Sequence, residues 1–275
     1  MSEAKAVAAH YTRPRLEETI LGAMKRAGLD TQKLTPTDLA PMDEFHVGGL
    51  EATKAFAEFM GLKPAMNVLD VGCGIGGPAR YFASEHGVRV TGIDLTEEFV
   101  RAAKSLTQLL HLENAATFEQ GSALAMPFKA ETFDAAYMFH VGMNIADKNA
   151  LFLDVARVLK TGARFSIFDL MRTNDEPISY PVPWAVSGET SFVVKIEGYR
   201  KALAAAGFEV VHEQERRNFA IEFTEKNMAR AAQGGPPILG LQLLMGETAP
   251  QMMKNVLAAF KSGIFEPVEL IAVKN

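Results

Sequence analysis

The sequence predicts an α/β fold: a doubly wound, mostly parallel sheet of seven strands with a helical cap. Three observations carry this prediction. Between residues 67 and 170, five short apolar strands alternate with helical segments, which is the pattern of a parallel sheet covered on both faces. The residues before 63, and those from 222 to 262, have helical periodicity instead. The chain ends in a further strand, FEPVELIAV, which we expect to run antiparallel to the others.

The core strands are short apolar runs, and the segments between them have the spacing of helices. Thr96, followed by Glu97 and Glu98, gives one of these helices an N-cap and an acidic first turn. A later helix stops at Gly207 and leads into the sixth strand. The five parallel strands are expected at 67–71, 88–94, 116–121, 133–140 and 163–170.

This pattern divides one domain into four parts. We expect an N-terminal helical cap segment at 1–62 and a ligand-binding core at 63–221. A helical lid insertion at 222–262 then precedes the last strand of the core sheet at 263–275. A chain of 275 residues, 48% of them hydrophobic, is long enough to bury such a core.

Composition excludes several classes of protein. The net charge of −5 argues against binding nucleic acid through bulk positive charge. Cys73 is the only cysteine, which fits a reducing compartment. No segment resembles a signal peptide, and none approaches the roughly 18 apolar residues that span a bilayer. We therefore expect a cytoplasmic protein that does not bind nucleic acid or membranes. The oligomeric state cannot be read from the sequence.

The strongest functional signal is the run DVGCGIGG at 70–77, between the first strand and its helix. Glycines at 72, 74, 76 and 77 permit positive φ angles and close approach of a ligand to the backbone. Asp94 ends the second strand about 20 residues later, where a carboxylate can accept hydrogen bonds from ribose hydroxyls. Both a dinucleotide and S-adenosylmethionine satisfy this pattern.

Asp70 separates these two cofactors. Its carboxylate, two residues before the first glycine, would attract the ammonium group of a methionine tail but repel a pyrophosphate. An NAD-linked reductase of the short-chain type is also disfavoured, because no tyrosine is followed four residues later by the lysine that such enzymes use. The sequence therefore favours S-adenosylmethionine.

At this point the sequence resembles the class I S-adenosylmethionine-dependent methyltransferases over about residues 45–215. The resemblance rests on VLDVGCGIGG, GIDLTEEF, GSALAMPF and ARVLKTGARFSIFD. The runs DEFHVGGLEAT, HVGMNIADK, YPVPWA and GPPILGLQLLMG are similar to the branch of sarcosine/dimethylglycine, quinone-precursor and natural-product methyltransferases. The resemblance implies a Rossmann-like fold with cofactor contacts from Tyr11, Asp70, Gly72, Gly74, Asp94, Leu95, Ser122, Ala123 and Leu124.

One position departs from the family pattern. The family commonly has an aspartate at position 122, which accepts a hydrogen bond from the adenine amino group, whereas this chain has Ser122. A hydroxyl can still accept that bond but has no charge. We expect cofactor binding to survive this change.

Candidate catalytic residues follow the fourth and fifth strands. Ligands of open α/β sheets lie beyond the carboxyl ends of the strands, where we expect His140 and Asp169 to meet. His140 would be a base or position the acceptor, with Asp169 orienting the imidazole. His46 and Trp184 are candidates for the acceptor site.

The sequence leaves the methyl acceptor open. We expect a small molecule, methylated on O, N or C, that has an apolar part. A small amine such as sarcosine or dimethylglycine would instead need a cation for its carboxylate, and Arg172 is the first candidate, before Arg13 and Lys195. A non-catalytic S-adenosylmethionine-binding protein is the other alternative. Metal-ligand spacings such as C-x-x-C are missing, so no metal is expected.

Overall fold

A computed structural model describes residues 3–275. Its centre is a seven-stranded sheet in the order β3-β2-β1-β4-β5-β7-β6. The first five strands in this order run parallel, and β7 is antiparallel to both of its neighbours. The strands are β1 (Asn67–Val71), β2 (Arg89–Asp94), β3 (Ala116–Gln120), β4 (Phe133–Phe139), β5 (Leu159–Arg172), β6 (Phe208–Glu215) and β7 (Phe265–Lys274). The predicted fold class is confirmed.

Helices cover both faces of the sheet. The face with α7 and α8 packs on Leu69, Met138 and Ile167 of the strands. The opposite face has α4 and α5 packed on Val68 and Phe139. The helices flanking the sheet are α4 (Gly49–Met60), α5 (Gly77–His86), α6 (Glu97–Leu109), α7 (Lys148–Val158) and α8 (Ile196–Ala205).

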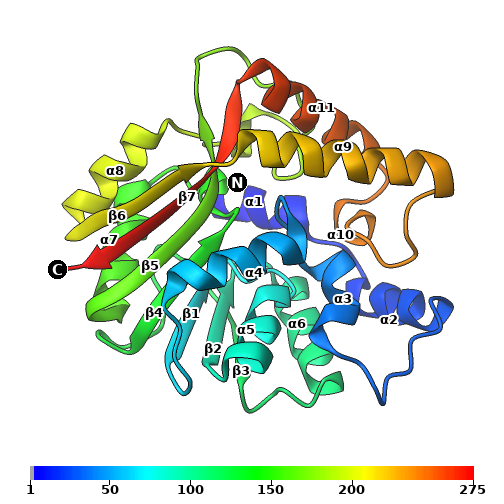
Figure 1. Cartoon of the computed structure of the whole chain (residues 1–275), viewed down its shortest axis with the longest axis horizontal. Coiled ribbons are helices and arrows are strands. Elements are labelled where there is room, and N and C mark those ends of the chain that lie inside the picture. The colour runs from blue at the N-terminus through cyan, green and yellow to red at the C-terminus, as the bar shows by residue number, and fades with distance from the viewer. Residues whose placement is uncertain (1–2) are drawn as a thin grey trace.

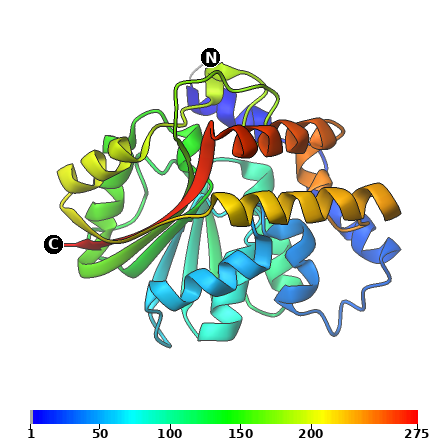
Figure 2. The same cartoon turned by 45° about the horizontal axis from the view of Figure 1, so that its top comes forward.

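The remaining helices form a cap at one end of the sheet. Figures 1 and 2 show them at the end away from the C-terminus of the chain. Because β7 is antiparallel, that end is where the parallel strands finish. The cap helices are α1 (Glu3–Tyr11), α2 (Leu16–Arg26), α3 (Pro36–Asp43), α9 (Arg217–Gly234), α10 (Gln242–Met245) and α11 (Ala249–Ser262). The chain also has two short helical turns, η1 (Gly142–Asn144) after β4 and η2 (Gly188–Thr190) after β5.

The lid insertion begins earlier than its predicted start at 222. Helix α9 starts at Arg217, five residues before that position. Arg217 Nε lies 2.8 Å from Glu266 Oε2, and Arg216 Nε lies 3.3 Å from Glu269 Oε1. These two ion pairs attach the first turn of the lid to β7.

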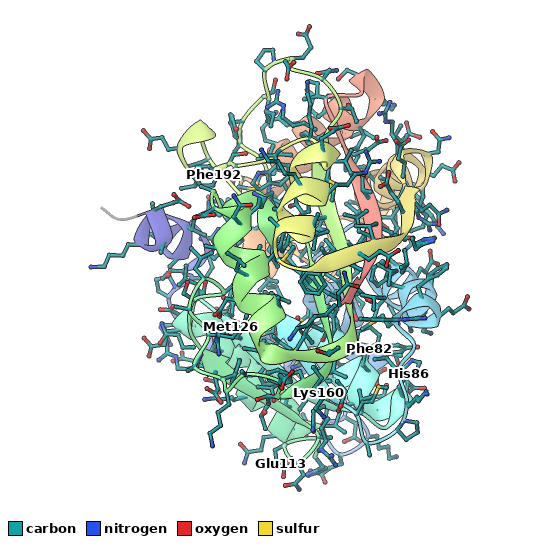
Figure 3. All side chains as sticks on the ribbon, turned by 90° about the vertical axis from the view of Figure 1, so that its left-hand side faces the viewer. Phe82, His86, Glu113, Met126, Lys160 and Phe192 are labelled. Atoms are coloured by element: carbon teal, nitrogen blue, oxygen red, sulfur yellow. The ribbon has the colours of Figure 1, made fainter. Side chains whose placement is uncertain are left out.

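None of the helices in the described part of the chain is long and apolar enough to cross a membrane. Figure 3 views the end of the molecule opposite the cap, where Lys160 is labelled at the start of β5.

Candidate active site

The glycine-rich loop after β1 is tied to the end of β2. The N–H groups of Gly72 and Cys73 both donate to the carbonyl of Ile93, over 2.8 and 3.0 Å. Gly72 has a φ of +75°, and a Cβ there would lie 2.4 Å from Val141 of the turn after β4. Gly74 has a φ of +52°, and a Cβ there would meet nothing within 4 Å. The loop therefore packs tightly on one side and is open on the other.

Two carboxylates lie beside this loop. Asp94 accepts the N–H of Gly74 at 2.9 Å and the N–H of Thr96 at 2.8 Å, one on each oxygen. The two hydrogen bonds lower the pKa of Asp94, but burial has the larger effect and raises it overall. Asp70 accepts the hydroxyl of Tyr137 over 2.7 Å. Burial raises the pKa of Asp70 to about 8, although the Tyr137 bond opposes the shift.

A single large cavity brings most of the expected site residues together. Its volume is about 1710 Å³, and its lining residues come from the carboxyl ends of the strands and from the cap. The predicted residues that line it are Tyr11, His46, Asp70, Gly72, Gly74, Asp94, Leu95, Ser122, Ala123, Leu124, His140 and Trp184. Their individual roles stay predictions.

Two leucines line the end of the cavity near β2 and β3. Leu95 is half-buried and Leu124 is 39% exposed, although both are large apolar side chains. Ser122 accepts the N–H of Leu124 on its hydroxyl oxygen, over 3.2 Å, which orders the loop after β3.

His140 is held as a neutral ring. Its Nδ1 lies 3.0 Å from the carbonyl oxygen of Phe168, which can only accept a hydrogen bond. The proton is therefore assigned to Nδ1, and Nε2 accepts the N–H of Val47 over a long 3.4 Å. Burial and the neighbouring His46 lower the pKa of His140 to about 3. At neutral pH the ring presents a lone pair on Nε2.

The expected contact between Asp169 and His140 is wrong. Successive side chains of a strand point to opposite faces, and His140 lies against Phe168, 4.9 Å between ring centroids. Asp169 therefore points to the other face, where it accepts the hydroxyl of Tyr199 and the N–H of Gly142, each over 2.7 Å. Asp169 supports the turn that follows His140 but does not orient the imidazole.

Arg172 does not reach the cavity either, which corrects its expected role in binding an acceptor carboxylate. Strand β5 continues two residues past its predicted end, and Arg172 bonds to the carbonyl oxygens of Asn174 (3.0 Å) and Glu176. Trp184 does lie in the cavity wall. Its Nε1 donates to Ser191 over 2.9 Å, and its ring packs on Phe265.

Two parts of the site were missed from sequence. Glu44 is buried beside His46, with 2.9 Å between Glu44 Oε2 and His46 Nε2, and it accepts the hydroxyl of Thr53 over 2.6 Å. Asn144 accepts the hydroxyl of Tyr11 over 2.6 Å and donates to the carbonyl of Trp184 over 2.8 Å. Glu44 could have been suspected from its spacing two residues before His46. No local signal marks Asn144.

Comparisons with known proteins agree with this geometry. Residues 69–167 match the methyltransferase domain family. A sterol 24-C-methyltransferase of Gibberella zeae is 33% identical over 165 residues, which cover 58% of this chain and 43% of the relative. A phosphoethanolamine N-methyltransferase of Triticum aestivum is 33% identical over 182 residues, 66% of this chain and 35% of the relative. This chain thus spans less than half of either relative.

Among solved structures, a geranyl diphosphate C-methyltransferase of Streptomyces coelicolor has the same fold, with a TM-score of 0.71 at 18% identity. The superposition covers 100% of this chain and 99% of that one. The matched domain includes the loop after β1, Asp94 and the turn after β4, which form the sheet side of the cavity. On these grounds residues 69–167 of the chain are a methyltransferase domain, and the whole chain has the fold of that solved methyltransferase.

Proposed function

We propose that this protein transfers the methyl group of S-adenosylmethionine to a small-molecule acceptor that has a substantial apolar part. The single observation that carries the proposal is the continuity of the cavity. It joins the glycine loop, Asp70 and Asp94 at one end to an apolar chamber under α9 and α11 at the other. Its volume of about 1710 Å³ exceeds the roughly 300–1,000 Å³ of a pocket for one ligand. Donor and acceptor can therefore lie side by side.

The residues at the loop end fit the donor. Asp70 would hold the ammonium group of the methionine part, with backbone approach allowed at Gly72 and Gly74. The two oxygens of Asp94 are each fixed by one backbone N–H and keep lone pairs for the two ribose hydroxyls. Leu95 and Leu124 would cover the two faces of the adenine.

The chemistry asked of the protein is modest. When bound, the sulfonium cofactor supplies an activated methyl group. The chain must align the acceptor with it and keep water out, which is the main source of rate in an in-line displacement. Tyr11 and Asn144 tie α1 to the turn after β4 and so help to close the cavity. His140 lies where that turn begins and would position the acceptor.

The cations suggested for a small carboxylated amine are used elsewhere. Arg172 and Arg13 donate to backbone carbonyl oxygens, and Lys195 lies 2.9 Å from Asp175. The chamber instead has Met245 and Met253 in its wall, together with Trp184. This supports an acceptor with an apolar part over an amine of the sarcosine type.

Calorimetry tests the proposal directly. S-adenosylmethionine and S-adenosylhomocysteine should each give a saturable signal with the purified protein, and NAD⁺ should give none. Release of S-adenosylhomocysteine with an acceptor then separates an enzyme from a non-catalytic binding protein. Saturable binding of NAD⁺ alone would refute the proposal.

Binding of S-adenosylhomocysteine should strengthen as the pH rises. The raised pKa of Asp70, about 8, leaves its carboxyl neutral in the free protein at lower pH, whereas the ligand ammonium needs it ionised. Affinity should then rise by as much as about tenfold per pH unit from about pH 5.5 to pH 7.5. Asp70→Asn should bind weakly with little pH dependence. A wild-type affinity that is flat over this range contradicts the role of Asp70.

Replacing Ser122 with aspartate should not weaken binding of S-adenosylmethionine, and a modest gain is expected. The carboxylate would accept the adenine amino group with charge assistance, in place of the neutral hydroxyl. Titration by calorimetry measures this. Because Ser122 also accepts the N–H of Leu124, Ser122→Ala is the matched control and should bind less tightly than the wild type. Tenfold weaker binding by Ser122→Asp would disprove the assignment.

A further inference from the structure

We propose that the acceptor is an uncharged, largely apolar hydroxyl compound whose hydroxyl donates to Nε2 of His140. This inference rests on the proposed methyl transfer and specifies the acceptor class. Three features of the cavity support it: the sign of its charges, the apolar wall of its acceptor end, and the protonation state of His140.

Among residues 3–275, every charged side chain that lines the cavity is a carboxylate, with one exception. The exception is Arg230, which is solvent-exposed on α9. The carboxylates are Glu3, Asp43, Glu44, Glu51, Asp70, Asp94, Asp147 and Glu247. Arg80 offsets the charge of Asp43, and Asp70 is neutral in part until the donor binds, but the remaining carboxylates still outnumber Arg230. A field of this sign favours a sulfonium donor and disfavours an anionic acceptor.

The buried cations beside the cavity already have partners. Arg80 lies 2.7 Å from Asp43, and the ammonium group of Lys148 donates to the carbonyl oxygens of Ile145 and Phe192. An anion that entered the chamber would lose its hydration without gaining an ion pair. Phosphoethanolamine and geranyl diphosphate, named in the descriptions of the related proteins, both carry phosphate groups. We therefore infer that this chamber selects a different acceptor.

The wall of the acceptor end is apolar and adaptable. Helices α9 and α11 contribute to it, opposite the turn after β4 and the segment that carries the tryptophan. Methionine side chains in such a wall adjust to the shape of an apolar ligand. The principal residues are Met143, Trp184, Phe223, Met228, Met253 and Val256.

His140 decides which group of the acceptor faces the donor. Its Nδ1 proton is used by the Phe168 carbonyl, so Nε2 can only accept. The N–H of Val47 reaches it over 3.4 Å, a long contact that a hydroxyl can replace with a shorter one. A protonated aliphatic amine could also donate here, but the surrounding carboxylates would keep it protonated and without a nucleophilic lone pair.

The reaction balances with these groups alone. A lone pair of the hydroxyl oxygen forms the new O–CH₃ bond while the C–S bond breaks, and its electrons stay on sulfur. The hydroxyl proton passes to Nε2 of His140 as the oxygen gains positive character. The imidazolium then returns the proton to water once the products leave.

A charge series on one ring skeleton tests the acceptor class. The probes are 2-naphthol, 2-naphthyl phosphate and 2-naphthylmethylamine, titrated into protein saturated with S-adenosylhomocysteine. We expect 2-naphthol to bind at least about tenfold more tightly than the phosphate, and the difference to shrink with added salt. Labelled S-adenosylmethionine should convert 2-naphthol to 2-methoxynaphthalene. Equal or tighter binding of the phosphate, methylation of the amine alone, or no saturable binding of 2-naphthol would overturn the inference.

His140→Phe tests the hydrogen bond. The change should weaken binding of 2-naphthol by about five- to tenfold, which is the effect of one hydrogen bond. Binding of 2-methoxynaphthalene should not change, because that ether cannot donate a hydrogen bond. His140→Gln, which keeps an acceptor, should recover part of the loss. Equal changes for both probes would show that the ring only shapes the chamber.

Binding of S-adenosylhomocysteine to each variant is measured first and separates the two proposals. If the cofactor product fails to bind the wild type, the proposed function fails. If it binds and the naphthol series gives the opposite order, only the acceptor class is wrong.

Discussion

Asp94→Ala is expected to weaken binding of S-adenosylhomocysteine by more than about 100-fold. The two ribose hydroxyls would lose a charged acceptor, and hydrogen bonds to charged groups contribute about 1.5–3 kcal/mol each. The change also removes the acceptor for the N–H groups of Gly74 and Thr96, so the open face of the glycine loop would lose its support. Calorimetry on the folded variant measures the loss.

Asp134→Ala is the matched control. Asp134 also accepts a backbone N–H, that of Asn67 over 2.8 Å, and lies 2.6 Å from Lys160. Lys160 lies at the end of the sheet opposite the cap (Figure 3), and neither residue lines the cavity. The control should bind the ligand as the wild type does. An Asp94→Ala variant that binds within threefold of the wild type would contradict the ribose assignment.

The positions of the residues at the glycine-loop end of the cavity could be predicted because their signals are local. Strand β1 was predicted at 67–71 and lies at Asn67–Val71, and the glycine loop, Asp70 and Asp94 follow directly from the ends of β1 and β2. In a parallel sheet the ends of neighbouring strands meet at one edge. Short patterns of residue type and spacing are enough for such a site.

The acceptor end could not be predicted because it depends on distant contacts and on strand orientation. His140 and Asp169 both follow buried strands, yet alternation along β5 places Asp169 on the face of Tyr199. His140 also has a φ of +55°, a left-handed conformation that its residue type does not reveal. The contact of Asn144 with Tyr11 joins residues 133 positions apart. Nothing in either local sequence indicates the other.

Asp43→Ala should lower the free energy of unfolding by about 3–5 kcal/mol, because it leaves the charge of Arg80 buried without a partner. Arg80 is fully buried and its guanidinium lies 2.7 Å from Asp43, with further bonds to the Ala103 carbonyl and the Thr107 hydroxyl. Since proteins are stable by only about 5–15 kcal/mol, the loss should be visible as an early midpoint in urea unfolding.

The double variant Asp43→Leu with Arg80→Met should be compared with Asp43→Ala. It removes both charges while filling the space with apolar groups, so it should recover most of the lost stability. Loss of the exposed Arg15–Glu18 pair through Glu18→Ala should leave the midpoint unchanged.

The double variant should still bind S-adenosylhomocysteine less well than the wild type. The backbone carbonyl of Asp43 packs against Gly77 at the start of α5, so the pair also places the cap on the glycine loop. Full recovery of both stability and affinity would show that packing alone, without the ion pair, holds α3 against that loop.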